Sequence, residues 1–383
     1  MNKSSRETAK EGAIKALEHC AKHTGFYASG LPGGYEATWA RDSMVTSLGA
    51  SLIDKKFQSP FRASIELLSV HQSALGQIPN AVGSYNIERK SEVTFNSIDS
   101  TLWYVIGHQV YGRAYQDNSL LTKYRQNIEK ALLWLRYQDP NEDKLIVQQP
   151  TMDWEDAFPH KYGRVLNTQA LHYAALRMWG QEELAEHIRR VVNGEIEEYL
   201  ALYDKKLGYY LPWAWKNHDG DREQEEWFDT LGNLLAIVTG LATESIAKSI
   251  LEHIEKNKIH RPYPCRAIDP PLKKGSKEWH SYFEKCDAKK PYVYSNGGVW
   301  PFIGGFYVAA LVKTGQWEKA EQELELLAQA NKLGNKQEWE FHEWLHGKTG
   351  KIGFSSAAFQ GWSAGTYLFA SECVNRKKLL YFC

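Results

Sequence analysis

The chain has 383 residues, of which 43% are hydrophobic and 24% are charged, as in an ordinary globular protein. Lys plus Arg and Asp plus Glu number 46 each, so the net charge is zero and neither nucleic acid nor an anionic membrane is indicated as a partner. The five cysteines form no C-x-x-C pair, and neither a signal peptide nor an apolar run long enough to span a membrane is visible. We therefore expect a cytoplasmic protein without disulfides.

Helical periodicity, with apolar residues at i, i+3, i+4 and i+7, dominates the chain. It predicts twelve helices, at residues 4–23, 41–54, 58–74, 97–117, 119–139, 167–179, 181–202, 228–240, 243–257, 299–314, 316–332 and 359–373. Strand signals are short and are limited to residues 145–149 and 209–211.

The predicted helices come in pairs with short connections, such as 228–240 with 243–257. Longer loops rich in Gly, Pro and aromatic residues precede every second helix. Six helical hairpins predict an all-α (α/α)6 toroid or barrel, formed as a single domain by residues 1–383. The long loops should then gather at one end and form a cavity. A superhelical repeat protein is the structural alternative, although no repeat of fixed length is visible.

Residues 342–346 read HEWLH and match the H-E-x-x-H motif. On a helix this spacing places two histidines on one face for zinc, with a glutamate beside them as general base. Here Gly347 follows at once, and no histidine lies downstream to serve as a third ligand. Because so short a motif also matches by chance, we expect neither a metal nor an organic cofactor.

Two acidic segments are rich in aromatic residues. TMDWEDAFPH holds Asp153, Glu155 and Asp156, and EWEFHEWLHG holds three glutamates that include Glu343. Apolar surroundings raise the pKa of a carboxyl group, which makes it a general acid near neutral pH. Glycoside hydrolysis uses one carboxyl group to protonate the leaving oxygen and another to activate water. The alternative for each single carboxylate is helix capping or ion pairing.

Other loop residues are suited to binding a sugar. Trp39 can stack on a sugar ring, and Arg41 with Asp42 can bond hydroxyl groups. Asp42 and Asp99 also stand at helix starts, where capping is an equal alternative. The residues expected to line the cavity are Trp39, Arg41, Asp42, Asp99, Trp154, Asp229, Asn296, Gln360 and Trp362.

Several of these loops resemble a known family. WFDTLGNLLAIVTGLA, YSNGGVWPFIGGFYVAALVKTG and SIDSTLWYVI are similar to stretches of the neutral/alkaline invertases, an α/α six-hairpin glycoside hydrolase family. WARDSMV and GQIPN look closer to glycogen-debranching-type glucosidases of the same clan. The matches run in order from Trp39 to about Trp362, which is nearly the whole chain.

The resemblance implies catalytic roles. In both groups the general acid is an Asp ahead of a helix that begins like Gln169-Ala170-Leu171, which corresponds to Asp156, with Asp153 as the competing candidate. The base is a Glu before a T-G turn and an aromatic Q-x-W, which corresponds to Glu343. The implied reaction is hydrolysis of an α-glucosidic bond with inversion, for which the two carboxyl groups should stand ~6.5–9.5 Å apart.

The chain also departs from the invertases. Ala157-Phe158 and Ala357-Ala358 stand where that family has basic residues, and Ser43 replaces a phenylalanine. The glucose side of the pocket is therefore better matched than the fructosyl side. Sucrose is one expected substrate, and an α-1,6-linked glucan or a glucosyl conjugate, as for a debranching-type glucosidase, is the alternative.

Two further alternatives concern the reaction itself. A phosphorylase would need a basic phosphate site near Glu343, for which Lys348 and Lys351 are the nearby residues. A carbohydrate-binding α/α barrel without catalysis is the alternative outside enzymes. In each case the partner is a small-molecule sugar, and assembly into a homo-oligomer is left open.

Overall fold

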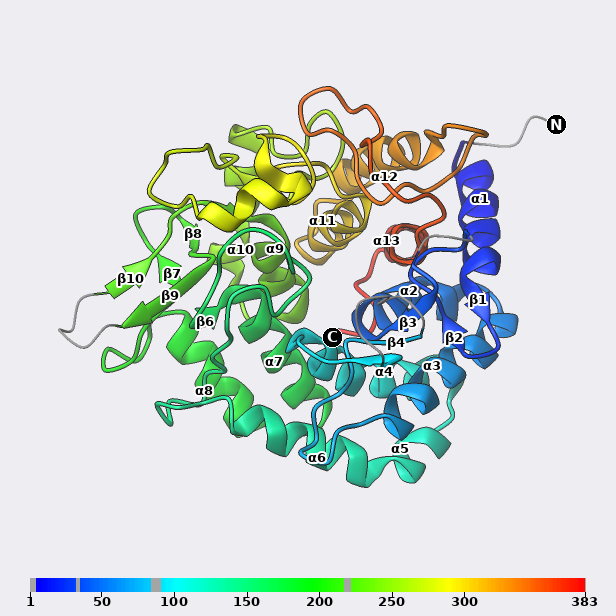
Figure 1. Cartoon of the computed structure of the whole chain (residues 1–383). Helices are drawn as coiled ribbons and strands as arrows, with labels where there is room; N and C mark the ends of the chain where they lie inside the picture. Colours follow the sequence, from blue (N-terminus) through cyan, green and yellow to red (C-terminus); the bar gives the residue numbers. More distant parts are fainter. Residues whose placement is uncertain (1–4, 32–34, 84–90, 217–221, 383) are drawn as a thin grey trace.

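The computed structural model describes residues 5–31, 35–83, 91–216 and 222–382. Six helices in these ranges form an inner ring, in which each helix packs against the next and the last packs against the first (Figure 1). These are α2 (Ala40–Ile53), α4 (Asp99–Tyr115), α7 (Leu166–Met178), α9 (Thr230–Thr239), α11 (Pro301–Lys313) and α13 (Gly361–Asn375).

The remaining helices pack around the inner ring. They are α1 (Ser5–Cys20), α3 (Gln58–Val70), the short α5 (Ser119–Lys123) with α6 (Arg125–Arg136), α8 (Glu182–Val192), α10 (Glu244–Lys256) and α12 (Trp317–Lys332). If α5 and α6 are counted as one outer helix, outer and inner helices alternate along the chain and form six hairpins. The fold is the predicted all-α (α/α)6 barrel.

Burial distinguishes the two rings. Every residue of α9 is buried, because this helix has helices on both sides of it. The outer helix α6 buries only one face, through Ile128, Ala131, Leu132, Trp134 and Leu135 at helical spacing. The amphipathic pattern that indicates a surface helix is consequently clear in the outer ring and weak in the inner ring.

The ring closes through glycine contacts between α2 and α13. A Cβ atom on Gly49 would lie 1.9 Å from the Gly365 carbonyl oxygen, and one on Gly365 would lie 2.4 Å from that of Thr46. Only a residue without a side chain allows the two backbones to approach this closely.

Short antiparallel strands and 3-10 turns occupy the connections. Three-stranded sheets join β3 (Ala37–Trp39), β4 (Ala81–Gly83) and β5 (Val93–Thr94), and likewise β10 (Arg222–Gln224), β9 (Trp213–Lys216) and β6 (Arg164–Val165). Paired strands are β1 (Ala21–Lys22) with β2 (Gly25–Phe26), β7 (Tyr203–Asp204) with β8 (Tyr209–Tyr210), and β11 (Phe228–Asp229) with β12 (Ile268–Asp269). The 3-10 helices are η1 (Lys55–Phe57), η2 (Ser281–Lys285) and η3 (Asp287–Lys289).

Each of the twelve predicted ranges contains a helix in the structure, although some of the predicted boundaries were wrong. The helix expected at 119–139 is divided at Tyr124, and the one expected at 181–202 ends at Val192, just before Gly194 with φ +74°. The strand expected at 145–149 is only an isolated bridge from Gln148 to Gly163, whereas the one at 209–211 is β8. Residue 4 lies outside the described residues.

No helix in the described part of the chain is both long and apolar enough to cross a bilayer. The assignment of residues 1–383 to one domain stays a prediction.

Candidate active site

A pocket opens where the inner helices begin. Its described lining is strongly aromatic and contains three carboxyl groups and one guanidinium group. The lining residues are Ala28, Tyr35, Trp39, Arg41, Asp42, Trp154, Asp156, Tyr294, Trp300, Glu343 and Trp362. Larger grooves lie on the outer surface, such as that between α6 and α8. Four acidic residues also line this groove, but Tyr137 is the one aromatic residue of its described lining, so it lacks the aromatic walls of the pocket.

The inner helices contribute to the pocket through their first residues. Arg41 and Asp42 lie in the first turn of α2, Trp300 precedes α11, and Trp362 is the second residue of α13. Helix N-termini carry a partial positive charge and free N–H groups. This end of the barrel therefore favours carboxylates and the oxygen atoms of a polar ligand.

Glu343 comes from the loop before α13, and hydrogen bonds fix its carboxyl group. Its backbone N–H donates to the Ala357 carbonyl at 2.8 Å, and the Ala357 N–H donates to Glu343 Oε2 at 3.4 Å. The Tyr35 hydroxyl donates to Glu343 Oε1 at 3.3 Å. Glu343 is only 3% exposed, whereas the Asp156 side chain is exposed at the pocket.

Loss of hydration raises the pKa of each of the three pocket carboxyls, through burial of Glu343 and Asp42 and through the protein packed around the more exposed Asp156. The pKa of Glu343 rises to about 8, chiefly because of burial, with Asp42 and Asp156 adding repulsion. The pKa values of Asp42 and Asp156 each rise to about 6, again chiefly because the surrounding protein restricts hydration, while Arg41 opposes both shifts. Because the groups repel one another, they titrate as a cluster.

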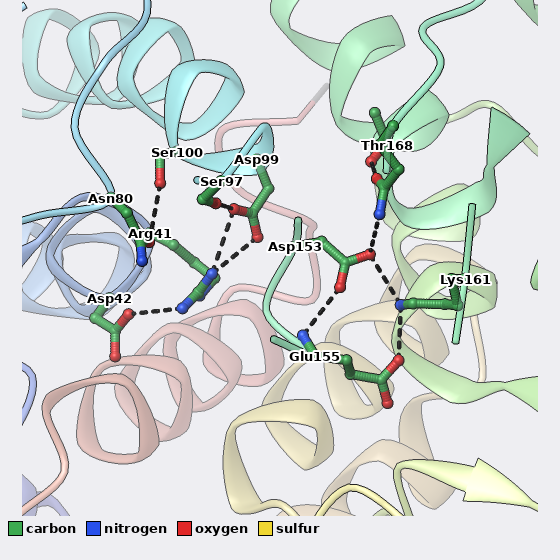
Figure 2. Close-up of polar contacts among 11 residues, drawn as sticks. Arg41, Asp42, Asn80, Ser97, Asp99, Ser100, Asp153, Glu155, Lys161 and Thr168 are labelled. Carbon is green, nitrogen blue, oxygen red and sulfur yellow. Dashed lines mark hydrogen bonds and ion pairs between the residues drawn. The ribbon is translucent and has the colours of Figure 1, made fainter. Parts of the chain in front are cut away.

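Arg41 is the one basic residue among the described residues that line the pocket. Its Nη1 donates to Asp99 Oδ2 at 3.1 Å and to Oδ1 at 3.3 Å, and its Nη2 lies 3.5 Å from Asp42 Oδ2 (Figure 2). Asp99 also accepts from the Ser97 hydroxyl. The guanidinium group is thus held by carboxylates of two inner helices, and it moderates the charge of the pocket.

Asp153, the competing candidate for the acid, does not line the pocket. Its Oδ2 accepts from Gln148 Nε2 at 3.1 Å and lies 2.9 Å from Lys161 Nζ. Its Oδ1 accepts from the Glu155 N–H at 2.9 Å. Both oxygen atoms therefore have protein partners, and the geometry favours Asp156 over Asp153.

The pocket brings together seven of the residues predicted from the sequence: Trp39, Arg41, Asp42, Trp154, Asp156, Glu343 and Trp362. Four others are absent from the lining. Asp99 holds Arg41, and Asp229 caps α9 by accepting from the Gly232 N–H at 3.1 Å. Asn296 bonds the backbone of Leu272, and Gln360 is the buried residue directly before α13.

Sequence reasoning missed Ala28, Tyr35, Tyr294 and Trp300 as lining residues. Tyr294 and Trp300 lie within YSNGGVWP, a segment from which only Asn296 was chosen. Aromatic residues in the loops before inner helices were the available signal, since Tyr35 precedes α2 and Trp300 precedes α11.

The H-E-x-x-H segment is not helical. Leu345 pairs with Val299 through the backbone, so the two histidines do not share a helix face. His342 Nε2 lies 3.0 Å from Glu340 Oε2, while His346 Nδ1 accepts from the Lys348 N–H at 3.2 Å. Among the described residues, no three His, Cys, Asp or Glu side chains are grouped to hold a metal ion.

Comparison with known proteins places this pocket in context. Residues 191–377 match the family described as alkaline and neutral invertase. A probable alkaline/neutral invertase D of Arabidopsis thaliana is 36% identical over 167 residues, which are 43% of this chain and 29% of the relative. A probable chloroplastic alkaline/neutral invertase A of the same plant is 24% identical over 346 residues, or 74% and 52% of the two chains. The chain thus spans about half of these relatives or less.

Solved structures share the fold at low sequence identity. A GH63 mannosylglycerate hydrolase from Thermus thermophilus, in complex with Tris and D-glycerate, has a TM-score of 0.69 at 15% identity, covering 95% of this chain and 100% of its own. A rhamnosidase from Klebsiella oxytoca with rhamnose bound has a TM-score of 0.65 at 13% identity, covering 96% and 64%. The chain therefore has an (α/α)6 glycosidase fold, and its resemblance to the alkaline and neutral invertases, indicated by its motifs, is confirmed.

Proposed function

We propose that this chain is an inverting glycoside hydrolase that cleaves an α-glucosidic bond. The observation that carries the proposal is that Asp156 and Glu343, from two loops far apart in sequence, line one pocket with aromatic walls. Two carboxyl groups and a sugar-stacking surface are what this reaction requires. The family match and the glycosidase neighbours support the same reaction class.

In this mechanism Asp156 protonates the glycosidic oxygen as the bond to the anomeric carbon breaks. Glu343 takes a proton from a water molecule that attacks the same carbon from the opposite face, so the configuration inverts. Asp42 and Arg41, beside these groups, are suited to bonding sugar hydroxyls that tighten in the transition state.

Water is favoured over phosphate as the second substrate. A phosphate needs a free cation beside Glu343, yet Arg41 is already paired with Asp99 and Asp42. Lys348 and Lys351 are exposed and lie outside the described lining. Since both carboxyl groups are present in the pocket, catalysis is also favoured over sugar binding alone.

The finer question is which group is attached to glucose in the substrate. The relatives named as invertases favour sucrose, and the neighbour with bound D-glycerate favours a small glucosyl conjugate as the alternative. A debranching-type α-1,6-glucosidase is the other candidate, supported by the sequence at WARD and GQIPN. The cytoplasmic setting stays a prediction, and an assembly of identical copies stays open.

The proposal is tested by measuring glucose release from sucrose, trehalose, maltose, isomaltose, α-1,6-branched dextrins and glucosylglycerate. NMR identifies the anomer that appears first. We expect β-glucose from one substrate, and a loss of about 10²–10⁴-fold in both Asp156→Asn and Glu343→Gln. Glu338→Gln is the matched control, because this glutamate belongs to the same segment but is exposed.

Retained activity in Asp156→Asn or Glu343→Gln would contradict the assignment of that residue. Initial α-glucose would contradict inversion. Sugar binding without turnover in the wild-type chain would instead support the non-catalytic alternative.

A further inference from the structure

Lys161 lies five residues after Asp156, and its ammonium group is buried among carboxylates. The side chain is 1% exposed, and Nζ lies 2.7 Å from Glu155 Oε2 and 2.9 Å from Asp153 Oδ2 (Figure 2). Asp229 Oδ2 lies 3.9 Å from the same Nζ. Lys161 is not part of the pocket lining. A buried ammonium group is tolerated only where carboxylates pair with it, so this position is strongly specified.

The side chains around Asp156 alternate between two sides of the segment. Trp154 and Asp156 line the pocket, whereas Asp153 and Glu155 point to Lys161. The backbone of this segment bends and belongs to no strand, yet its successive side chains face opposite sides. Lys161 therefore binds the side of the segment that faces away from the pocket, and the proposed acid lies on the side that faces the pocket.

The same cluster connects this segment to two inner helices. Asp153 accepts from Gln148, which in turn accepts from the Thr168 hydroxyl in α7. Asp229, the third carboxylate near Lys161, caps α9. These contacts anchor residues 153–156 to two helices of the barrel rather than to the loop alone.

We propose that Lys161 is a positioning residue that holds Asp156 at the pocket in the geometry needed for proton donation. The inference rests on the proposed function, because it takes Asp156 as the general acid. Without the ammonium group, Asp153, Glu155 and Asp229 would repel one another in a buried site. The segment between Asp153 and Asp156 would then move, and proton transfer would suffer first.

The dependence on the leaving group distinguishes this role from a general loss of structure. An O-glucoside leaves as an alcohol and needs the proton of Asp156. In α-D-glucosyl fluoride the bond between C1 and fluorine breaks to release fluoride, which needs no proton, while water adds to C1 and gives its proton to Glu343. Loss of acid catalysis therefore slows the first substrate and largely spares the second.

The experiment compares kcat on the preferred O-glucoside and on α-D-glucosyl fluoride. Lys161→Met removes the charge and keeps most of the volume, and Asp156→Asn is the reference for lost acid catalysis. For Lys161→Met we expect about a hundredfold loss on the O-glucoside and less than about tenfold on the fluoride. Lys274→Met, whose side chain is 73% exposed, is the matched control and should equal the wild type on both substrates.

Equal losses on the two substrates, or no loss, would overturn the positioning role. Should circular dichroism show that Lys161→Met is unfolded, Glu155→Gln takes its place, because it weakens one of the two close ion pairs and keeps an acceptor. About tenfold selective loss on the O-glucoside is then expected, and equal rates on both substrates overturn the role. An Asp156→Asn variant with full O-glucoside activity would overturn the proposed acid itself.

Discussion

At the scale of single residues, Asp42, Asp156 and Glu343 meet in one pocket from three separate segments. The sequence predicts the acidic and aromatic composition of two of these segments, and the family resemblance identifies one carboxyl in each. It does not predict that Tyr35 bonds Glu343 or that Lys161 gathers Asp153 and Glu155, because these contacts depend on how loops from different hairpins approach one another.

The raised pKa values predict the pH dependence of the reaction. Catalysis needs the acid protonated and the base ionised, and the pocket carboxyls have pKa values raised to about 6 and about 8. Below the lower pKa the base keeps its proton, and above the higher pKa the acid has lost its own, so activity falls on both sides. We expect a bell-shaped profile of kcat/KM with limbs near these values and an optimum near neutral pH.

The profile should be recorded for the wild type and for Glu338→Gln, which should coincide. The two limbs belong to the coupled cluster rather than to single residues. The positions of the two limbs therefore do not depend on which carboxyl has which pKa. An optimum below about pH 5, where ordinary exposed carboxyls titrate, would contradict the raised pKa values.

At the scale of elements, the number and order of the helices could be predicted from periodicity and loop composition. The end of α8 could not, because the helical pattern continues past Val192, while the backbone turns at Gly194. The two-residue strands around β6 and β11 were also missed, since they are set by pairing with distant loops rather than by local alternation. Periodicity in the sequence indicates which side chains of a segment are buried. A strand of two residues is too short to show such a pattern.

The contact between α2 and α13 leads to a prediction about stability. In Gly49→Ala the new methyl group would meet the Gly365 carbonyl at 1.9 Å, so the two helices must separate. We expect the free energy of unfolding to fall by about 1–3 kcal/mol, the usual cost of overpacking a core. Urea denaturation followed by circular dichroism measures the change.

Glu129→Ala on α6 serves as the control, because its side chain is half exposed and it makes only a surface pair with Arg125. Its effect should stay within about 0.5 kcal/mol. A Gly49→Ala chain as stable as the wild type would show that the helices at this contact can separate without loss.

At the scale of the whole molecule, the ring explains how carboxyls from distant loops meet. The starts of α2, α11 and α13 line the pocket, and Asp99 at the start of α4 pairs with Arg41, so the loops before these helices share one rim. Glu343 lies within the region that matches the invertase family, at 191–377, whereas Asp156 lies outside it. The hairpin count therefore predicts the common rim even where the family match does not reach.

The ring also predicts how the chain unfolds. One contiguous buried core runs from Ala9 in α1 to Phe382, and each inner helix packs against two others. Loss of any hairpin would expose the faces of both neighbours, so partial unfolding is costly. Chains of this size often populate intermediates, but a closed ring should unfold as one cooperative unit, as the assignment of residues 1–383 to a single domain requires.

Urea unfolding followed in parallel by far-UV circular dichroism and by tryptophan fluorescence tests this prediction. The 14 tryptophans are spread along the chain from Trp39 to Trp362, so fluorescence reports on most of the barrel, while circular dichroism reports on the helices. The two transitions should coincide, and Gly49→Ala should lower both midpoints together. Separate midpoints for the two signals would mean that part of the barrel unfolds alone, and the chain would then contain more than one folding unit.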